Sequence, residues 1–418
     1  MREMKDSGIE WIGEIPKEWK VVRNKNLFLC NKAIVGKESN KTQLLSLTKN
    51  GVKEKSKNDF SGKVPETFDT YQYVKINDIV MCLFDLDCSA VFSGISLYDG
   101  MISPAYKILK CNENTVPRYI DYWFKFVFDG RKFKSYSKNL RFTLNYDEFA
   151  VLPIPSLPLS EQQRIASFLD VKCAEIDNVI AKSKDSIEEY KKLKQSVITQ
   201  TVTKGIRPYN TKETTSIWFS SIPENWCIKR LKYLFSIKKD IAGEEGYTVL
   251  SITQKGIKPK DLSKNEGQIA QNYSNYQKVN VGDFAMNHMD LLTGWVDISV
   301  YDGVTSPDYR VFILNDKVNN SSRYYLYLMQ MCYTNRIFYS LGQGVSGMGR
   351  WRLQADKFLN FYIPVPPLSE QQEIADYLDE KCSAIDELIA KKEQFIVEME
   401  NYKKSLIYEY VTGKKEVQ

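Results

Sequence analysis

Two stretches of the chain carry the same narrow stripe of apolar residues. Their seam positions alternate in steps of four and three, and charged residues fill most positions between them. This spacing predicts a helix that buries one thin face, as in a coiled coil. Because so narrow a seam needs a partner and the chain contains one match, we predict a long antiparallel helix pair. The seam positions are Leu169, Cys173, Ile176, Ile180 and Ile187 in the first stretch and Leu378, Cys382, Ile385, Ile389 and Ile396 in the second.

The two stretches are copies of one another. The segment Pro158–Lys182 returns 209 positions later at Pro367–Lys391 without a gap. Upstream, Leu45–Lys53 returns 205 positions later at Leu250–Lys258. Further matches on either side extend the repeat over the whole unit. The chain is therefore predicted to be an internal duplication.

Each long helix is predicted to begin at a serine. Ser160 and Ser369 are followed three positions later by Gln163 and Gln372, which is the spacing of a capping box. Prolines just upstream end the preceding segments. A helix from Ser160 to Thr203 would be roughly 66 Å long.

The remaining sequence predicts two similar mixed domains. Short runs rich in Val, Ile and Tyr, separated by Gly, Asn and Asp, are typical of strands. One amphipathic helix is expected in each copy, near 118–133 and 322–338. The expected fold class is mixed α+β, with two similar α/β domains joined by two long helices that pack as an antiparallel coiled coil. This arrangement has internal pseudo-two-fold symmetry. We predict the domains at 1–155 and 205–365, and the helices at 156–204 and 366–418.

Composition adds three expectations. Of the 418 residues, 43% are hydrophobic, which is ample for two cores, and the formal net charge of +6 permits a polyanionic partner without requiring one. Eight scattered cysteines without a Cys-x-x-Cys pair favour a reducing compartment. There is no long apolar run or signal-peptide segment, so a soluble cytoplasmic protein is expected.

No motif indicates chemistry in this chain. The Ser-Pro-x-Tyr motifs at 103–106 and 306–309 are similar to the loop with which amino-methyltransferases hold a flipped base, but both lack its second proline. The glycines of Gly342-x-Gly344-x-x-Gly347 occur in one copy only and lack the acidic residue of a dinucleotide site. His288 is the single histidine, and no phosphate-binding Gly-Lys loop occurs. We predict no catalytic residue, metal site or cofactor.

The copies differ most in one loop. The second copy has six extra residues in a glycine-rich stretch at 342–352, where the first copy has only 138–141. Two similar scaffolds with different loops suggest two related binding surfaces that recognise different things. Neutral drift of surface loops is the alternative.

Basic and aromatic residues alternate in loop-like stretches, a mixture that suits phosphate contacts and base readout. We hypothesise that the loops 81–91, 136–141, 286–295 and 342–352 face the major groove. Arg350 and Arg352 are expected to contact guanine or phosphate, and Asn287 adenine. An ordinary lysine-rich surface is the alternative. The candidate DNA-binding residues are Lys53, Lys55, Lys57, Asp85, Asp87, Lys138, Asn139, Arg141, Lys258, Lys260, Asn287, His288, Asp290, Gln343, Ser346, Arg350 and Arg352.

The sequence resembles the specificity (S) subunit of type I restriction–modification enzymes over essentially its full length. The resemblance is carried by the opening segment Ser7–Trp19, the two Tyr-Asp-Gly-x-x-Ser-Pro-x-Tyr blocks and the two Pro-Leu-Ser-Glu-Gln-Gln helices. The second copy departs from this pattern at 217–223, which does not repeat the full opening segment.

The resemblance implies two target-recognition domains, each reading one half of a bipartite double-stranded DNA site, with the helices setting the gap. It also implies two methyltransferase (M) subunits and restriction (R) subunits as partners, which carry the S-adenosylmethionine, ATP and Mg. No membrane contact is expected. The alternative is a coiled-coil scaffold that binds only proteins; a methyltransferase is a third and weaker hypothesis.

Overall fold

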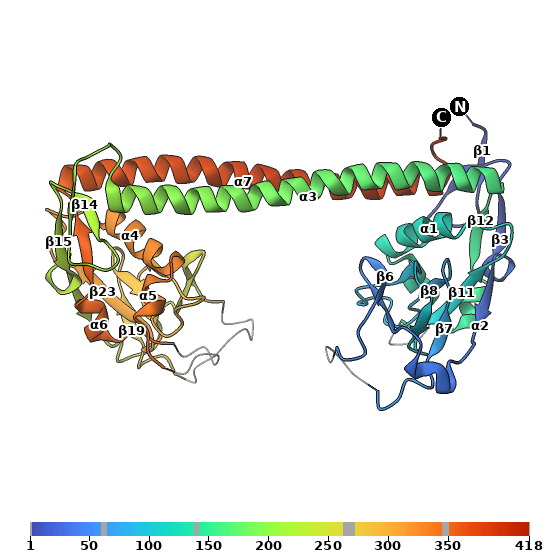
Figure 1. Cartoon of the computed structure of the whole chain (residues 1–418), viewed down its shortest axis with the longest axis horizontal. Helices are drawn as coiled ribbons and strands as arrows, with labels where there is room; N and C mark the ends of the chain where they lie inside the picture. Colours follow the sequence, from blue (N-terminus) through green and yellow to red (C-terminus); the bar gives the residue numbers. More distant parts are fainter. Residues whose placement is uncertain (1, 60–64, 138–141, 262–271, 345–350, 418) are drawn as a thin grey trace. The chain divides into compact units, whose positions relative to one another are not determined.

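The computed structural model describes residues 2–59, 65–137, 142–261, 272–344 and 351–417 (Figure 1). The chain divides into two compact units, unit 1 (Met1–Ser183 with Glu393–Gln418) and unit 2 (Lys184–Lys392). Each unit contains one mixed domain and one half of each long helix. The fold is the predicted one, with helices and strands mixed and a long helix pair.

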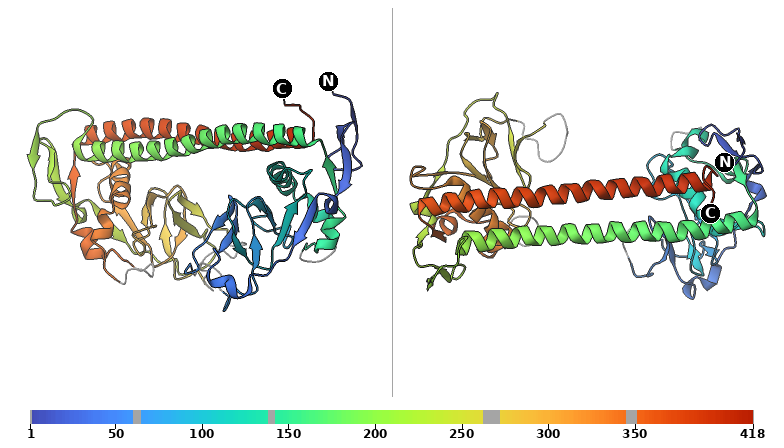
Figure 2. Two further views of the ribbon diagram at one scale, coloured as in Figure 1. Left: turned by 45° about the vertical axis from the view of Figure 1, so that its right-hand side comes forward. Right: turned by 90° about the horizontal axis from the view of Figure 1, so that it is seen from above.

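The long helices are α3 (Leu159–Lys204) and α7 (Leu368–Val411). In each unit the N-terminal half of one helix lies beside the C-terminal half of the other, so the pair is antiparallel (Figure 2). Leu169 and Leu378 are fully buried, and Ile389 is half-buried. The predicted seam is therefore confirmed, since its other members are also buried: Cys173, Ile176, Ile180, Ile187, Cys382, Ile385 and Ile396.

Two equivalent ion pairs join the long helices. In unit 1 the Lys403 ammonium lies 2.6 Å from the Asp177 carboxylate, and in unit 2 Lys194 lies 2.7 Å from Asp386. Both lysines continue the seam spacing, since they lie seven residues after Ile187 and Ile396. At such positions a lysine stem can pack on the partner helix while its charged end reaches water. A seam of this kind tolerates lysine because an aspartate of the other helix accepts its charge.

The predicted capping box is wrong. In α3 the carbonyl of Pro158 accepts the N–H groups of Glu161 and Gln162, both at 3.0 Å, so the helix begins at Leu159 and Ser160 lies exposed inside the first turn. Pro367 does the same for α7. The proline carbonyl serves as the first acceptor of the helix, which leaves no capping role for the serine.

In the first turn of each long helix, a buried glutamine forms side-chain hydrogen bonds to the segment that precedes a shorter helix. Gln162 accepts the N–H of Val116 at 2.8 Å and donates to the carbonyls of Asn114 and Leu157. In unit 2, Gln371 accepts the N–H of Ser321 at 2.8 Å. The first turn of each long helix therefore satisfies the otherwise unpaired N–H at the start of a shorter helix.

The domain of unit 1 is built from short antiparallel strands. Four of them form a sheet in the order β4-β11-β8-β9, and the other eight pair as two-stranded ladders. The strands are β1 (Met4–Asp6), β2 (Glu14–Pro16), β3 (Lys20–Arg23), β4 (Phe28–Asn31), β5 (Leu45–Thr48), β6 (Gly51–Glu54), β7 (Gln72–Val74), β8 (Ile79–Met81), β9 (Ser93–Ile95), β10 (Gly100–Ile102), β11 (Lys107–Cys111) and β12 (Pro153–Ser156).

The domain of unit 2 repeats this topology, with the corresponding sheet in the order β16-β23-β20-β21. Its strands are β13 (Thr211–Glu213), β14 (Ser221–Pro223), β15 (Cys227–Arg230), β16 (Phe235–Lys238), β17 (Leu250–Thr253), β18 (Gly256–Pro259), β19 (Gln277–Val279), β20 (Phe284–Met286), β21 (Val296–Ile298), β22 (Gly303–Thr305), β23 (Arg310–Leu314) and β24 (Tyr362–Val365).

One helix in each unit lies between the sheet and the helix pair (Figure 1). These are α1 (Pro117–Asp129) and α4 (Ser322–Thr334), which are shorter than predicted. Arg131 at φ +50° and Arg336 at φ +56° adopt the left-handed conformation that ends a helix. The smaller helices are α2 (Tyr146–Ala150), α5 (Ile337–Ser340) and α6 (Ala355–Leu359), with 3₁₀ turns at Asn24–Asn26, Gly36–Asn40, Lys132–Tyr136 and Leu231–Tyr233.

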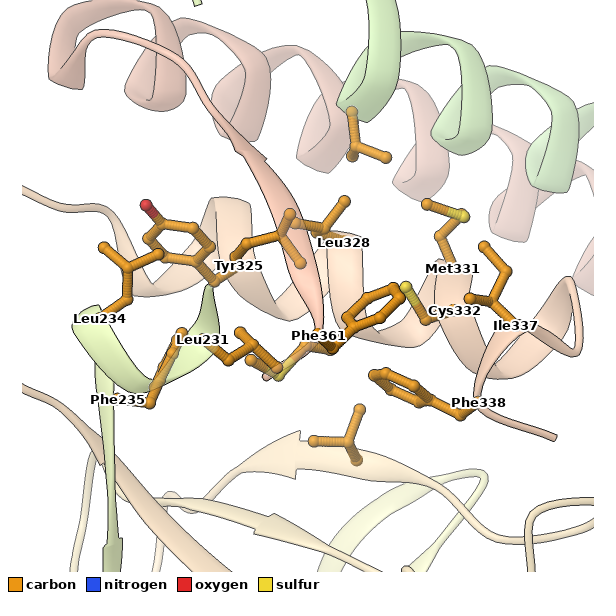
Figure 3. Close-up of a cluster of buried hydrophobic side chains, with 14 of the residues drawn as sticks. Leu231, Leu234, Phe235, Tyr325, Leu328, Met331, Cys332, Ile337, Phe338 and Phe361 are labelled. Carbon is orange, nitrogen blue, oxygen red and sulfur yellow. The ribbon is translucent and has the colours of Figure 1, made fainter. Parts of the chain in front are cut away.

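The core of unit 2 fills the space between α4 and the sheet (Figure 3). Tyr325 and Leu328 of α4 face Leu231, Phe235 and neighbouring side chains, and all of them are buried. Each fully buried side chain of this size stabilises the fold by about 1.5–3 kcal/mol. The core therefore holds α4 firmly against the sheet.

The glycines of the two Tyr-Asp-Gly motifs have a structural role. A Cβ on Gly100 would lie 2.6 Å from the carbonyl oxygen of Gln43, and one on Gly303 would lie 2.4 Å from that of Thr248. The following Ser-Pro-x-Tyr turns are held by Gln72 and its counterpart Gln277, whose amide donates to the Tyr309 carbonyl at 2.7 Å. These contacts make the motifs part of the scaffold.

Candidate nucleic-acid interface

The loop that follows β20 is ordered by its own polar side chains. Asn287 accepts the N–H groups of Met289 and Asp290, and Asp290 accepts those of Leu292 and Thr293 at 2.9 and 3.0 Å. From α4, the Tyr333 hydroxyl donates to the Asn287 carbonyl at 2.7 Å. Asn287 and Asp290 are half-buried, and these bonds use oxygens that were expected to face DNA. Their base contacts remain a prediction, and the amide donors of Asn287 are the groups suited to it.

The corresponding loop of unit 1, after β8, is held by an arginine side chain from outside the loop. Asp85 adopts φ +51°, and its carbonyl accepts the N–H of Ser89 at 2.7 Å. Arg131, just beyond α1, donates to the carbonyls of Leu86 and Ser89 at 3.3 and 2.8 Å. Asp87 at the tip is exposed.

The described ends of the glycine-rich insertion of unit 2 form a closed stem. Gln343 and Arg352 form an antiparallel bridge with two backbone hydrogen bonds of 2.8 and 3.0 Å. Trp351 packs on Tyr339 with ring centroids 5.6 Å apart, and its indole donates to the Tyr339 carbonyl. The side chains of Gln343 and Arg352 are exposed, so both are available to a partner.

A polar pair lies beneath these loops. Arg310 on β23 is only 5% exposed, and its guanidinium donates to the Leu353 carbonyl at 2.8 Å. Burial, reinforced by the charges of Arg310 and Arg352, lowers the pKa of His288 to about 4, and burial lowers that of Arg310 to about 10. Unit 1 has Leu83 at the position of His288, since the N–H of Leu144 bonds to Leu83 as that of Leu353 bonds to His288. The neutral histidine is thus a feature of one copy.

The candidate lysines fall into two groups: some are half-buried or hydrogen-bonded within the protein, and others are exposed. Lys57 donates to the carbonyls of Ser39 and Asn40, both at 2.8 Å, and therefore braces the local chain. Lys55 is half-buried, 3.9 Å from Asp59, and Lys260 is also half-buried. Lys53 and Lys258, at equivalent positions on β6 and β18, are exposed and suit contacts to phosphate.

A cleft of about 610 Å³ in unit 1 brings the predicted Lys53 together with two cations that sequence reasoning missed, Lys125 and Lys403. It lies between the β5–β6 hairpin, β9, α1 and the helix pair, and Lys49, Lys53, Lys125 and Lys403 line it. Lys125 and Lys403 are paired with Asp121 and Asp177. Of these two lysines, only Lys403 continues the spacing of the helical seam in the sequence. The candidates Lys138, Asn139, Arg141, Ser346 and Arg350 lie outside the described residues.

The described residues show no group of three or more His, Cys, Asp or Glu side chains placed to hold a metal ion. Within the same part of the chain, no helix is long and apolar enough to cross a membrane. The ordered polar loops, the exposed cations and the duplicated scaffold are the features available for recognition.

Comparison with known proteins assigns these features to a family. Residues 223–397 match the type I restriction modification DNA specificity domain. The chain is 25% identical over 437 residues to the putative type I restriction enzyme MjaX specificity subunit of Methanocaldococcus jannaschii, which covers 96% of this chain and 95% of the relative. Over its full length the chain is similar to type I restriction enzyme specificity subunits, and residues 223–397 carry their DNA specificity domain. A second relative, the MjaVIII specificity subunit of the same organism, is 25% identical over 64% of this chain and 63% of its own length.

Solved structures share the fold of this chain. A chain from a study of complex assembly and conformational transition in a type I R–M system aligns with a TM-score of 0.70 at 13% identity, covering 96% of this chain and 99% of that one. The HsdS subunit from Thermoanaerobacter tengcongensis aligns with a TM-score of 0.52 at 14% identity, covering 96% and 98%. At such identities the agreement concerns the fold, which includes both domains and both long helices.

Proposed function

We propose that this chain is the DNA-recognition subunit of a type I restriction–modification complex. Each domain reads one half of a bipartite double-stranded DNA target. The paired helices set the gap between the half-sites and dock methyltransferase subunits, two in the complete complex, while restriction subunits join the same assembly.

One observation carries the proposal. The two domains share a strand order and an attachment to the helix pair, yet differ in the loops after β8 and β20 and in the insertion at 342–352. Equal scaffolds with unequal loops are what a reader of two different half-sites requires. A scaffold that only bound proteins would have no use for a second, differently polar set of loops.

The division of labour between side chains follows from their exposure. Lys53 and Lys258 supply sequence-independent contacts to phosphate, which position the domain on the duplex. Gln343 and Arg352 supply donors that read base edges, where one bidentate pair contributes roughly 1–3 kcal/mol of discrimination. We assign S-adenosylmethionine, ATP and Mg to the partner subunits and no catalytic step to this chain.

The test uses the purified chain with and without its methyltransferase partner. We expect the complex to bind and methylate DNA at a two-part sequence with a fixed gap, and the isolated chain to transfer no methyl group when S-adenosylmethionine is added. Methyl transfer by the isolated chain would overturn the non-catalytic assignment. Methylation by the complex without sequence preference would overturn the recognition role and favour the protein-only scaffold.

A further inference from the structure

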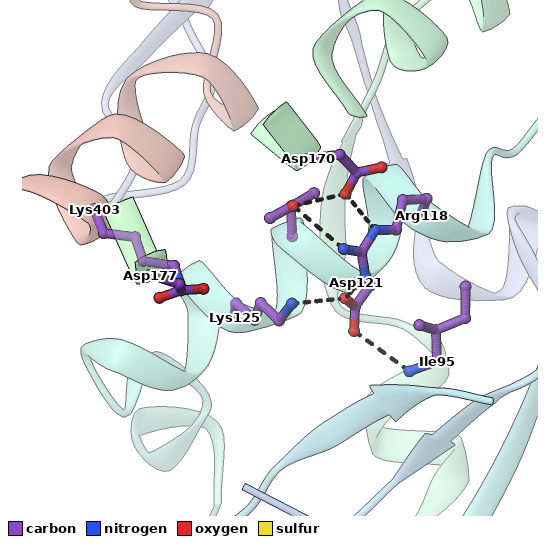
Figure 4. A network of polar contacts seen from close by, with 8 residues as sticks. Ile95, Arg118, Asp121, Lys125, Asp170, Asp177 and Lys403 are labelled. Carbon is purple, nitrogen blue, oxygen red and sulfur yellow. Dashed lines mark hydrogen bonds and ion pairs between the residues drawn. The ribbon is translucent and has the colours of Figure 1, made fainter. Parts of the chain in front are cut away.

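In both units an arginine, a tyrosine and an aspartate at equivalent positions connect the domain to the helix pair. In unit 1, Arg118 of α1 lies 2.6 Å from Asp170 of α3, and the Tyr122 hydroxyl donates to the same carboxylate at 2.8 Å (Figure 4). In unit 2, Tyr327 of α4 donates to Asp379 of α7 at 2.6 Å, and Arg323 pairs with Asp379 and, at 2.8 Å, with Asp376. We call these two clusters the clasps.

Each clasp is a second attachment point on its long helix. The first attachment lies at the start of the helix. In unit 1 the indole of Trp19 donates to Glu161 at 3.0 Å, and the side-chain oxygen of Gln162 accepts the N–H of Val116. Asp170 lies nine residues further on, which is about 13 Å along the helix axis. The shorter helix of unit 1 also contacts the other long helix, since the Tyr119 hydroxyl donates to the Val411 carbonyl of α7 at 3.0 Å. Together, attachments this far apart along the helices fix the orientation of the domain within the unit.

The clasp helix is linked onward to the recognition loops. In unit 1, Asp121 accepts the N–H of Ile95 on β9 at 3.3 Å and is paired with Arg118 and Lys125 (Figure 4). In unit 2, Gln330 donates to the carbonyl of Val296 on β21 at 3.1 Å. These strands directly follow the loops after β8 and β20.

The ends of the clasp helices contact those loops as well, through Arg131 in unit 1 and Tyr333 in unit 2. In unit 1, linked polar contacts therefore run from Asp170 through Arg118 and Asp121 to β9. In unit 2 the helix α4 itself connects the clasp to the residues that contact β21 and the loop after β20. Different residues build the far end of this connection in the two units, but the clasp itself is the same. A feature kept in both copies while its surroundings diverge points to a shared mechanical role.

We propose that the clasps are positioning devices that fix the gap length, by holding each recognition loop at a set distance and angle from the spacer helix. The proposal rests on the proposed function. Burial and the Asp170 carboxylate raise the pKa of Tyr122, which keeps its hydroxyl protonated as a donor. The clasp residues are not among the candidate DNA contacts, so we expect their loss to alter the tolerance for gap length and leave the half-site sequences unchanged.

The experiment compares two clasp variants with a matched control in the complete methyltransferase complex. The double variants Asp170→Asn with Asp379→Asn and Tyr122→Phe with Tyr327→Phe weaken both clasps. The control is Asp177→Asn with Asp386→Asn, because these carboxylates pair with lysines of the other long helix and not with α1 or α4. Each complex methylates a plasmid library in which the two half-sites, first determined for the wild type, are separated by every gap from two base pairs shorter to two longer.

In both clasp variants we expect methylation at neighbouring gaps, relative to the native gap, to rise about three- to tenfold, as for the loss of a partly exposed charged contact. The control should keep the narrow wild-type profile. A wild-type profile in the Tyr→Phe variant, with unchanged thermal unfolding and methylation rate, would overturn the proposal; this variant removes only hydroxyl groups, so it decides the matter if the Asp→Asn variant does not assemble. If the wild type itself shows no two-part target, the proposed function fails, which is distinct from a failure of the clasps.

Discussion

The side chains that differ between the two copies show how a duplicated core was adapted. Leu83 of unit 1 is buried, whereas its counterpart His288 lies beside Arg310, a buried cation with one strong hydrogen bond. A buried polar pair needs partners that an apolar residue does not. In unit 2 this pair lies at the loops of the candidate interface, so this difference between the copies falls where they are proposed to read different sequences.

This pair gives unit 2 a distinctive pH dependence. The pKa of His288 is lowered to about 4 in the folded chain, against about 6.5 when unfolded, so the unfolded chain binds the proton first as the pH falls. The stability contributed by the neutral histidine is present above pH 6.5 and is lost between about pH 6.5 and 4. Between pH 7 and 4.5 we expect the wild type to lose about 2 kcal/mol more than His288→Leu in chemical unfolding. Parallel pH curves for the two proteins would contradict this.

The first turns of the long helices offer a second residue-level prediction. Gln162→Ala removes an acceptor for the Val116 N–H and two donors, all in a buried setting, so we expect a loss of about 1–3 kcal/mol in the free energy of unfolding. Ser160→Ala is the control, since Ser160 is exposed inside the helix and its loss should change stability by less than about 0.5 kcal/mol. The reverse order of effects would restore the serine cap.

At the level of elements, sequence patterns predicted what periodicity determines. The seam follows from spacing alone, because a helix of 3.6 residues per turn places the seam residues on one face. The duplication follows from the repeated sequence, and the helix pair from the presence of one matching stretch. The helix starts were wrong because a proline carbonyl replaced the serine cap. The clasps were not predicted, since Arg118 and Asp170 are 52 positions apart and each resembles an ordinary charge on a helix surface.

The site was predicted less completely than the fold. Lys57 was singled out by composition, yet it bonds two backbone carbonyls, and the oxygens of Asn287 and Asp290 order their own loop. Residue type and loop position do not reveal which polar groups the loop itself consumes. Lys53, Lys258, Gln343 and Arg352 are the candidates whose exposed side chains match the expectation.

The length of the helix pair is open to a direct test. One heptad added after Ile187 and another after Ile396 keep the seam in register and lengthen each helix by about 10 Å, or roughly three base pairs. The methylated target should keep both half-sequences and gain a longer gap. Because the added base pairs also rotate one half-site about the DNA axis, the preferred gap is expected to be a compromise and binding to be weaker. Full activity at the original gap would show that the helices do not measure DNA.

At the level of the whole molecule, duplication separates two tasks. The parts that repeat closely, which are the helix pair, the clasps and the Gln162 and Gln371 contacts, hold the domains. The parts that diverge, which are the loops after β8 and β20 and the insertion at 342–352, are free to specify sequence. A change confined to the loops of one unit should therefore leave recognition by the other unit intact.

The most direct test of this account replaces one recognition loop and sequences the methylated sites. The segment 342–352 of unit 2, whose stem is closed by Gln343 and Arg352, is exchanged for a loop of different sequence in cells carrying the complete system. We expect one half of the bipartite target to change or relax, while the other half and the gap stay as in the wild type. Changes in both halves, or in neither, would contradict the claim that each domain reads its own half-site.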